Sequence, residues 1–446
     1  MRPLLPTGLA TGVLAATLLT APAAQAAADT CQGRPATVVG TPGRFGLTGT
    51  EGADVIVTNG ATSTSAFGGA DLVCVTGGTA TQPYMSVDAG AGDDVVDASA
   101  AGGGVWASLG AGSDTYAGST HGETIYAGTN RFATGTSIDT ERDVITTGAG
   151  GADDVFSGSD RTVLNSDVVV LAGGGGDLTW VGPFAAGGRL DGGGGSRLDF
   201  TVGSGAVVVD AVGGTLSQDG TVQLRWTGFD SYRTGESPSR TPSSFFFRGS
   251  GRDEELELRF SRAHTVDQRI DLGGGDDNLW MGARDTLGAR GSRYIGGPGK
   301  DHALIWGGKN LDVDLGRERI KSVRSGTTFR STFTGFESQL VGARKLRLTG
   351  TPKADDLRFR ACRATVRGRG GKDVIGKTTS GRRFPSRLQC GTRAFRLFGD
   401  GGDDLLRGGS GRDLLVGGRG RDTVFGNSGR DRCSGEKLRS CEIKRR

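Results

Sequence analysis

The stretch GDGGDDLLRGGSGRDLLVGGRGRDTVFGNSGRD, residues 399–431, places an aspartate at every ninth position. Aligned by nines, the chain reads GDGGDDLLR, GGSGRDLLV, GGRGRDTVF and GNSGRDRCS. Each unit is a glycine-rich turn of six residues ending in aspartate, followed by three residues with an apolar centre. Side chains alternate along a strand, so each apolar centre is expected to point inward. These centres are Leu406, Leu415, Val424 and Cys433.

A period of nine suits neither a helix nor an isolated strand, but it matches the nonapeptide of parallel β-solenoids. Two nonapeptides complete one coil, so we expect Asp404 to lie above Asp422 and Asp413 above Asp431. Calcium is a hard cation that takes six to eight oxygen ligands. The glycine-rich turns can supply carbonyl oxygens, and the stacked aspartates can supply negative charge. We therefore predict calcium sites at these four aspartates.

Weaker copies of the turn extend through most of the chain, and in the first half they recur about every 17 to 24 residues. One copy, GGGGSRLDF, carries Arg197 where we expect the aspartate. The spacing indicates larger, irregular coils with one acidic turn each. The weaker metal candidates are Asp54, Asp71, Asp94, Asp114, Asp153, Asp177, Asp277, Asp301 and Asp373.

The terminal array resembles the hemolysin-type calcium-binding repeat, also called the RTX repeat, with four consecutive matches over residues 399–434. The segment CQGRPATVVGTPGRFGLTGTEGADVIV, from Cys31, resembles the start of small secreted bacterial calcium-binding proteins of that family. The resemblance implies an all-β fold, a right-handed parallel β-roll or β-helix solenoid, with Ca²⁺ held between stacked turns. The implied ligands are turn carbonyls and the aspartates at the sixth position, Asp404, Asp413, Asp422 and Asp431.

Composition agrees with a packed repeat fold. The chain has 82 glycines among 446 residues, far above average usage, yet they do not recur at every third position as in collagen. Residues 1–26 read as a signal peptide, with Arg2, a short apolar core and the cleavage pattern Ala24-Gln25-Ala26. No later stretch is apolar enough to span a membrane. We therefore expect a secreted, extracellular protein.

Six cysteines follow the signal peptide, and an even number in an exported protein favours disulfides, although six allow 15 connectivities. The three sequence-adjacent pairs are separated by long cysteine-free stretches. Sequential pairing is therefore our prediction: Cys31–Cys74, Cys362–Cys390 and Cys433–Cys441.

The repeats divide the chain into five segments. After the signal peptide come N-terminal β-helical repeats at 27–185, a repeat module at 186–290 and its duplicate at 291–390. VVVD at 207–210 corresponds to LDVD at 311–314, and TGFDSYR at 227–233 to TGFESQL at 334–340. Residues 391–446 form the RTX β-roll with a disulfide-closed basic tail.

Charge is distributed unevenly. Residues 341–446 hold 27 Lys/Arg and 11 Asp/Glu, a net +16, which leaves −12 for the remainder of a chain whose total is +4. Arg412, Arg421 and Arg430 directly precede their aspartates and are expected to weaken calcium binding. Because Asp403 offsets Arg421, the pair Asp404/Asp422 should bind calcium more tightly than Asp413/Asp431. The other arginines read as solvated turn residues or as a surface for anionic polymers.

No HExxH or GxSxG motif occurs, so we expect no zinc-protease or lipase activity and no catalytic residues of that kind. The sequence thus favours a secreted calcium-binding repeat protein with a structural or interaction role. Two alternatives stay open: a cell-surface adhesin or binder of an anionic cell-wall or extracellular polymer, and a β-helical polysaccharide-degrading enzyme. The basic region carries no nucleic-acid-binding fold signature, so we do not expect a nucleic-acid partner.

Overall fold

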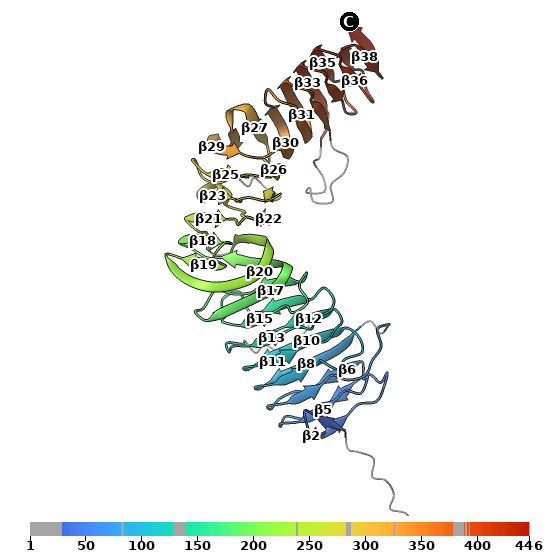
Figure 1. Cartoon of the computed structure of the whole chain (residues 1–446), viewed down its shortest axis with the longest axis vertical. Helices are drawn as coiled ribbons and strands as arrows, with labels where there is room; N and C mark the ends of the chain where they lie inside the picture. The colour runs from blue at the N-terminus through green and yellow to red at the C-terminus, as the bar shows by residue number, and fades with distance from the viewer. Residues whose placement is uncertain are drawn as a thin grey trace, which may run out of the picture.

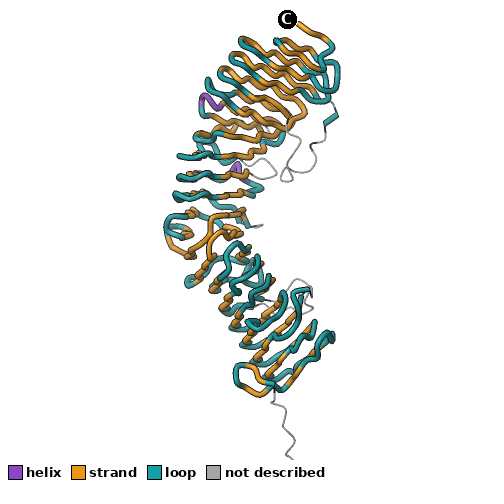
Figure 2. Tube along the Cα trace, turned by 45° about the vertical axis from the view of Figure 1, so that its right-hand side comes forward, coloured by secondary structure: helices purple, strands orange, loops and turns teal. Residues whose placement is uncertain are grey.

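The computed structural model describes residues 29–445 except 82–83, 129–138, 238–239, 282–286, 325, 378–387, 389 and 392. The expected signal peptide lies outside the described residues. The described chain is all-β, an elongated and gently curved stack of coils that runs from the N-terminal end to the C-terminus (Figures 1 and 2). Most strands pair in parallel with the second strand further along, so one coil typically contributes two strands. The parallel solenoid expected from the sequence is confirmed.

The N-terminal part begins with a small antiparallel pair, β1 with β2, and continues in short parallel strands. Its strands are β1 (Thr30–Cys31), β2 (Arg34–Pro35), β3 (Val38–Val39), β4 (Leu47–Thr48), β5 (Val55–Val57), β6 (Ser63–Ser65), β7 (Leu72–Cys74), β8 (Met85–Ala91), β9 (Val95–Asp97), β10 (Val105–Ala111), β11 (Thr115–Ala117), β12 (Glu123–Tyr126), β13 (Val144–Thr146), β14 (Asp154–Ser157), β15 (Val168–Val170) and β16 (Asp177–Trp180). Short strands suit a solenoid because glycine turns must interrupt each coil.

The middle part contains two antiparallel excursions from the parallel stack, β18–β19–β20 and β27–β28–β29. Its elements are β17 (Gly188–Val202), β18 (Ala206–Asp210), β19 (Thr215–Gln218), β20 (Thr221–Glu236), β21 (Ser244–Arg248), β22 (Glu255–Leu258), η1 (Ala263–Thr265), β23 (Asp267–Asp271), β24 (Asn278–Met281), β25 (Arg293–Ile295), β26 (His302–Trp306), β27 (Asn310–Asp314), η2 (Leu315–Arg317), β28 (Arg319–Arg324) and β29 (Thr327–Thr334). The duplicated motifs VVVD and LDVD fall on β18 and β27, the first strand of each excursion. The boundaries of the two modules stay a prediction.

The C-terminal part returns to regular parallel coils. Its strands are β30 (Ser338–Thr349), β31 (Asp356–Gly370), β32 (Val374–Lys377), β33 (Ala394–Gly401), β34 (Leu405–Arg407), β35 (Leu414–Arg419), β36 (Thr423–Phe425), β37 (Arg432–Ser434), β38 (Lys437–Arg439) and β39 (Ile443–Arg445). Leu405 of β34 pairs with Thr423 of β36, and Leu414 of β35 pairs with Arg432 of β37. This register means that nonapeptides two apart stack directly on each other.

Alternate residues of most strands face a large apolar core that runs along the stack from Ile56 to Cys441. The repeat centres Leu406, Leu415 and Val424 are fully buried and Cys433 is 2% exposed, as the period predicts. Stacking lets each coil bury its apolar side chains against its neighbours, which a single repeat cannot do. No described helix is both long and apolar enough to cross a membrane.

Disulfides close both ends of the solenoid and one coil between them. The structure pairs Cys31 with Cys74, Cys362 with Cys390, and Cys433 with Cys441. All three predicted connections are confirmed. The last of them joins β37 to the loop before β39, which ties the final coil to the one beneath it.

Candidate metal-binding rows

The four aspartates of the terminal array stack in two columns, as the nine-residue period predicts. The main-chain N–H of Asp404 donates to Oδ1 of Asp422 over 3.0 Å, and the N–H of Asp413 donates to Oδ1 of Asp431 over 2.9 Å. Their side chains are at most 3% exposed. The aspartates therefore occupy the last position of each turn, where the chain enters a strand of the stack.

The same contact recurs along the solenoid and builds four rows of acidic residues. In every step, a main-chain N–H donates to the carboxylate of the acidic residue one coil further, over 2.7–3.1 Å. The N-terminal row is Asp54, Asp71, Asp94, Asp114, Asp143 and Asp167; the middle row is Glu254, Asp277, Asp301 and Glu337; the C-terminal row is Asp355, Asp373, Asp404, Asp422 and Glu436; the short row is Asp413, Asp431 and Glu442.

In most of these carboxylates, only one oxygen accepts a hydrogen bond. The second oxygen is buried without a hydrogen-bond partner in Asp71, Asp94, Asp114, Asp143, Glu254, Asp277, Asp301, Asp373, Asp404, Asp422 and Asp431. Among the described residues, no lysine or arginine forms an ion pair with any member of the four rows. Buried charge without a counter-charge is costly, so these carboxylates are suited to bind a cation.

Arg412, Arg421 and Arg430 do not supply that charge. All three side chains are exposed, and their guanidinium groups form no ion pair with the aspartates that follow them. The Arg421 main chain instead donates its N–H to Asp403 over 2.8 Å. Neutralisation of the aspartates by the preceding arginines is therefore absent from the terminal array.

In several repeats, the first glycine of the nonapeptide leaves room beside the unused carboxylate oxygen. A Cβ on Gly399 would lie less than 3.0 Å from both Oδ2 of Asp404 and the carbonyl oxygen of Gly417 in the next coil. Gly368 has the same relation to Asp373 and to the carbonyl oxygen of Gly399. A carboxylate oxygen and a glycine carbonyl therefore converge on one space that only glycine keeps open.

The glycine at the fourth position of the nonapeptide is required by the backbone conformation. Gly402 and Gly420 have φ angles of +123° and +128°, which side chains of L-residues rarely adopt. A Cβ on Gly420 would also meet the carbonyl oxygen of Gly402 one coil below. This position explains the close stacking of successive turns.

Burial raises the pKa of several row carboxyl groups, and the charges of nearby carboxylates add to the shift. The pKa of Asp94 rises to about 8, those of Asp114, Asp277 and Asp373 to about 7, and that of Asp431 to about 6. The main-chain N–H donated from the coil below opposes the shift in each case. Burial likewise raises the pKa of Asp404 and Asp422. At neutral pH and without a bound cation, row carboxyl groups with a raised pKa therefore keep their protons, and those that are ionised repel one another.

The short row differs from the C-terminal row in how many oxygens stay unused. Asp413 accepts from the N–H of Phe395 through Oδ1 over 2.8 Å and from the N–H of Gly409 through Oδ2 over 2.6 Å. Asp404 and Asp422 each keep an unpartnered Oδ2. The pair Asp404/Asp422 thus offers two free carboxylate oxygens, whereas Asp413/Asp431 offers one.

Most of the weaker candidates lie in the rows. Asp54, Asp71, Asp94 and Asp114 belong to the N-terminal row, Asp277 and Asp301 to the middle row, and Asp373 to the C-terminal row. Asp153 forms a separate pair, because its Oδ1 accepts from the N–H of Glu123 over 3.0 Å. The structure therefore brings eight of the nine into the stacked arrangement; their role as metal ligands stays a prediction.

Asp177 is the exception, and its expected placement is wrong. It pairs in register with Asp154 and Arg197, so it is the first strand residue and not the last turn residue. Its carboxylate points outward and forms an ion pair with Arg197. Gly176 and Ser196 occupy the positions expected for Asp177 and Arg197, because the glycine-rich alignment GGGGDLTW allows a shift of one residue.

Several acidic residues of the stacked arrangement were not predicted from the sequence. Glu123, which pairs with Asp153, is one of them. Asp143 and Asp167 lie directly before β13 and β15 but follow turns without a glycine pair, and five further row members are Glu254, Glu337, Asp355, Glu436 and Glu442. Their shared signal is an acidic residue directly before a strand. The GGxGxD pattern does not contain this signal, because a turn of different length can end in the same position.

The donor set fits calcium better than a transition metal. Among the described residues, no three His, Cys, Asp or Glu side chains converge as a ready-made metal cluster. Carboxylates one coil apart and glycine carbonyls between them are all-oxygen donors, which calcium prefers. Charged carboxylate oxygens would come from Asp404 and Asp422, and neutral oxygens from carbonyls such as that of Gly417.

The comparison with known families agrees with this geometry. Residues 398–433 match the RTX calcium-binding nonapeptide repeat in four copies. Repeats of this kind bind calcium, and the match covers both Asp404/Asp422 and Asp413/Asp431. Among curated proteins, none matches the chain. The three disulfides of the structure fit an oxidising, extracellular location. We call residues 398–433 the RTX array.

Proposed function

We propose that the protein is a secreted, non-catalytic calcium-binding repeat protein whose coils fold as they take up Ca²⁺ outside the cell. The observation that carries the proposal is the set of buried, unpartnered carboxylate oxygens repeated along the rows. The RTX array supports calcium as the ion. The disulfides and the signal-like N-terminus support secretion. A structural or interaction role follows from a surface built of repeats.

Each part of a turn has a separate task in this proposal. Asp404 and Asp422 hold the ion through their free Oδ2 atoms, while their main-chain N–H groups and Oδ1 atoms fix the spacing of the coils. Gly399 keeps the space open between carboxylate and carbonyl. Bound calcium supplies positive charge that offsets the repulsion between stacked carboxylates.

Binding and folding should be coupled. The unfolded chain has no preformed site, so the free energy of calcium binding contributes to folding. The 82 glycines make the unfolded chain unusually rich in conformational entropy, which opposes folding. One site adds about 2.7 kcal/mol of stability when calcium exceeds its dissociation constant a hundredfold.

The test uses the chain from residue 27 onward, with its disulfides formed. Calcium is titrated calorimetrically to several millimolar, since extracellular modules bind with dissociation constants of about 10⁻⁴–10⁻³ M. Circular dichroism and thermal melts follow folding in calcium-free and calcium-containing buffer. We expect saturable heat, a raised melting temperature and a gain of β-structure.

A double variant separates site binding from loss of surface charge. Asp404→Asn/Asp422→Asn should remove at least one calcium site. Asp271→Asn/Glu318→Gln removes the same charge from two exposed residues outside the rows and should leave the stoichiometry intact. Magnesium at equal concentration should not substitute, because it demands a tighter octahedral shell. No calcium heat, or equal heat from both variants, would refute the proposal.

A further inference from the structure

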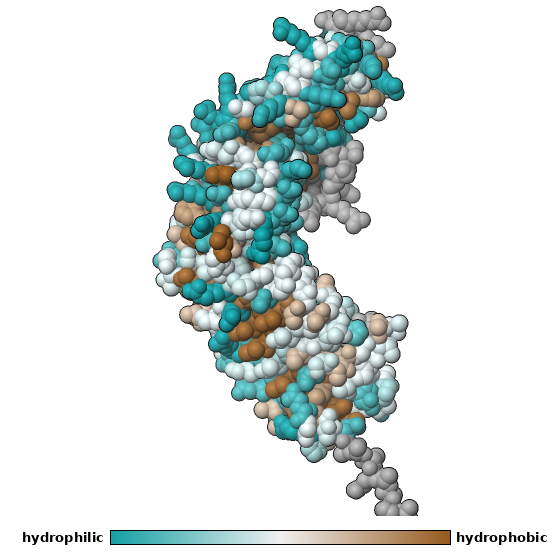
Figure 3. Space-filling view, viewed as in Figure 1, coloured by the Kyte–Doolittle hydropathy of each residue, from teal (hydrophilic) through white to brown (hydrophobic). Residues whose placement is uncertain are grey.

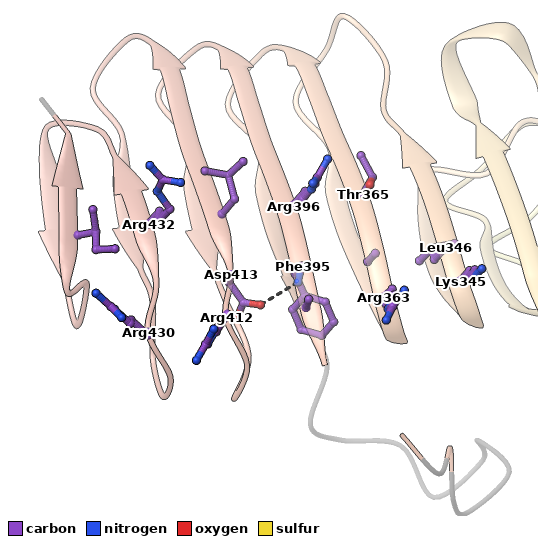
Figure 4. A pocket seen from close by; sticks show the side chains of 14 residues that line it. Lys345, Leu346, Arg363, Thr365, Phe395, Arg396, Arg412, Asp413, Arg430 and Arg432 are labelled. Carbon is purple, nitrogen blue, oxygen red and sulfur yellow. Dashed lines mark hydrogen bonds between the residues drawn. The ribbon is translucent and has the colours of Figure 1, made fainter. Parts of the chain in front are cut away.

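The C-terminal coils carry a groove of about 790 Å³ whose edges are basic. Figure 4 shows Lys345, Arg363, Arg412 and Arg430 along one edge, with Arg396 and Arg432 along the other. All six side chains are exposed. Hydrophilic side chains also project from this half of the molecule in Figure 3. The groove runs across successive coils and not along one strand.

Strand register explains the two edges. Lys345 pairs with Arg363 and Arg363 with Ala394, while Arg396 pairs with Leu414 and Leu414 with Arg432. The two columns are two residues apart, so both point outward while the residues between them point inward. At roughly 4.8 Å per coil, the five coils from β30 to β37 place the six cations along roughly 19 Å.

These six cations lack counter-charges in the described part of the chain. None of them forms an ion pair there. The carboxylate beside the groove belongs to Asp413, which is 3% exposed and has both oxygens engaged by main-chain N–H groups. The positive charge of the groove is therefore open to an external partner.

The middle of the solenoid shows how this chain otherwise manages outward charges. Arg233 lies between Asp199, at 3.1 Å, and Glu257, at 3.0 Å, on the neighbouring coils. Opposite charges alternate there, which stabilises adjacent strands, whereas like charges opposite each other destabilise them. The C-terminal columns carry the unfavourable arrangement, and an anionic ligand would reverse its effect.

We infer that this basic groove binds an extended acidic polysaccharide laid across the coils. A row of cations repeated at the coil spacing suits a linear chain with an anionic group on successive sugars. Bases of single-stranded nucleic acid would need exposed aromatic rings for stacking, and Phe395, the aromatic residue that lines the groove, is 1% exposed. The inference rests on the proposed function only in requiring the calcium-folded coils that carry the groove.

The experiment measures binding of the calcium-loaded protein to dextran sulfate, with uncharged dextran as the control polymer. A sulfated polymer is used because carboxylated ones sequester calcium. We expect binding to dextran sulfate alone, with an affinity that falls steeply as salt rises because displaced counterions return to the polymer. Equal binding to both polymers, or binding to neither, would overturn the inference.

Two triple variants with equal charge change locate the site. Lys345→Gln/Arg363→Gln/Arg396→Gln spares Arg412 and Arg430, which adjoin the aspartates of the short row. The control, Arg290→Gln/Arg293→Gln/Arg419→Gln, neutralises three exposed arginines outside the groove. The groove variant should lose at least tenfold in affinity and lower the salt slope by about two, at about 0.7 per lost contact. The control should lose less than twofold, and matching losses would overturn the assignment.

Calorimetry with calcium alone accompanies both variants and separates the two proposals. The groove variant should keep the calcium stoichiometry of the parent while losing polymer affinity. If the unmodified chain gives no heat of calcium binding, the proposed function is refuted. If it binds calcium but not the polymer, the groove assignment is refuted. A single-stranded oligothymidine that binds more tightly than dextran sulfate at equal charge and salt would replace the polysaccharide with nucleic acid.

Discussion

Asp404→Asn should change stability in opposite directions with and without calcium. An asparagine keeps an oxygen in place and exchanges the unpartnered Oδ2 for an amide that faces the same space as the carbonyl oxygen of Gly417. Removing a buried, unsatisfied charged atom should stabilise the calcium-free protein by about 1–3 kcal/mol. Loss of a charged ligand should lower the added stability from calcium. Chemical unfolding in both buffers measures the two effects, and destabilisation in both would contradict the assignment.

The two aspartate pairs of the RTX array should bind calcium with different affinities. Asp404/Asp422 offers two free carboxylate oxygens, whereas both oxygens of Asp413 already accept main-chain hydrogen bonds. Asp404→Asn should therefore remove the tighter calorimetric phase, and Asp413→Asn should affect only the weaker one. If the two variants lose equal affinity, the count of free oxygens does not control binding.

Several side chains were predictable because the repeat fixes both their spacing and their chemistry. The stacking of Asp404 on Asp422 follows from two nonapeptides per coil, and the inward Leu406 follows from strand alternation. Asp177 was misplaced because four consecutive glycines give the turn no unique register. Asp143 and Asp167 were missed because their position depends on how the chain enters β13 and β15, and not on glycine spacing.

Two glutamates and a disulfide close the C-terminal end of the stack. Glu436 and Glu442 accept hydrogen bonds from the main-chain N–H groups of Asp422 and Asp431, over 2.7 Å each, and thereby take the place that aspartates have in the preceding coils. The Cys433–Cys441 disulfide joins the same two coils. These terminal contacts were not predictable as a pair of caps, because neither glutamate belongs to a nonapeptide.

Removing that disulfide should loosen the C-terminal coils while the rest of the solenoid stays closed. For a loop of about eight residues, chain entropy alone assigns the bond roughly 2.5 kcal/mol. In a stack where each coil contacts mainly its neighbours, the loss stays local. Cys433→Ala/Cys441→Ala should therefore speed hydrogen exchange in β37, β38 and β39 and leave β7 and β10 unchanged. Faster exchange throughout the chain would show that the coils unfold as one unit.

The two antiparallel excursions show which features of the strands can be predicted from the sequence and which cannot. The correspondence of VVVD with LDVD predicts two related units, and these fall on β18 and β27. The hairpins that follow, β19 with β20 and β28 with β29, carry no glycine repeat of nine. Their direction depends on turns such as that at Asp219, which has a φ of +49°, and such local geometry is not encoded in a repeat period.

Across the whole molecule, the rows of buried carboxylates make the effect of pH depend on calcium. Without calcium, the pKa values of Asp94, Asp114, Asp277 and Asp373 lie near 7 or 8, against 3.8 in the unfolded chain. A raised pKa means that the folded state holds protons that the unfolded state has lost. The stability from these groups is therefore complete below about pH 3.8, falls progressively as the pH rises, and is lost once the pH has passed through 7 and 8.

The slope follows from the number of protons held. Near pH 6, each such group makes the free energy of unfolding fall by about 1.4 kcal/mol per pH unit as the pH rises. With calcium, the sign should reverse, because the ion needs deprotonated carboxylates and competes with protons for the same oxygens. Denaturant unfolding at pH 5, 6, 7 and 8, in metal-free buffer and in saturating calcium, measures both slopes. Parallel slopes in the two series would mean that calcium binds elsewhere than at these rows.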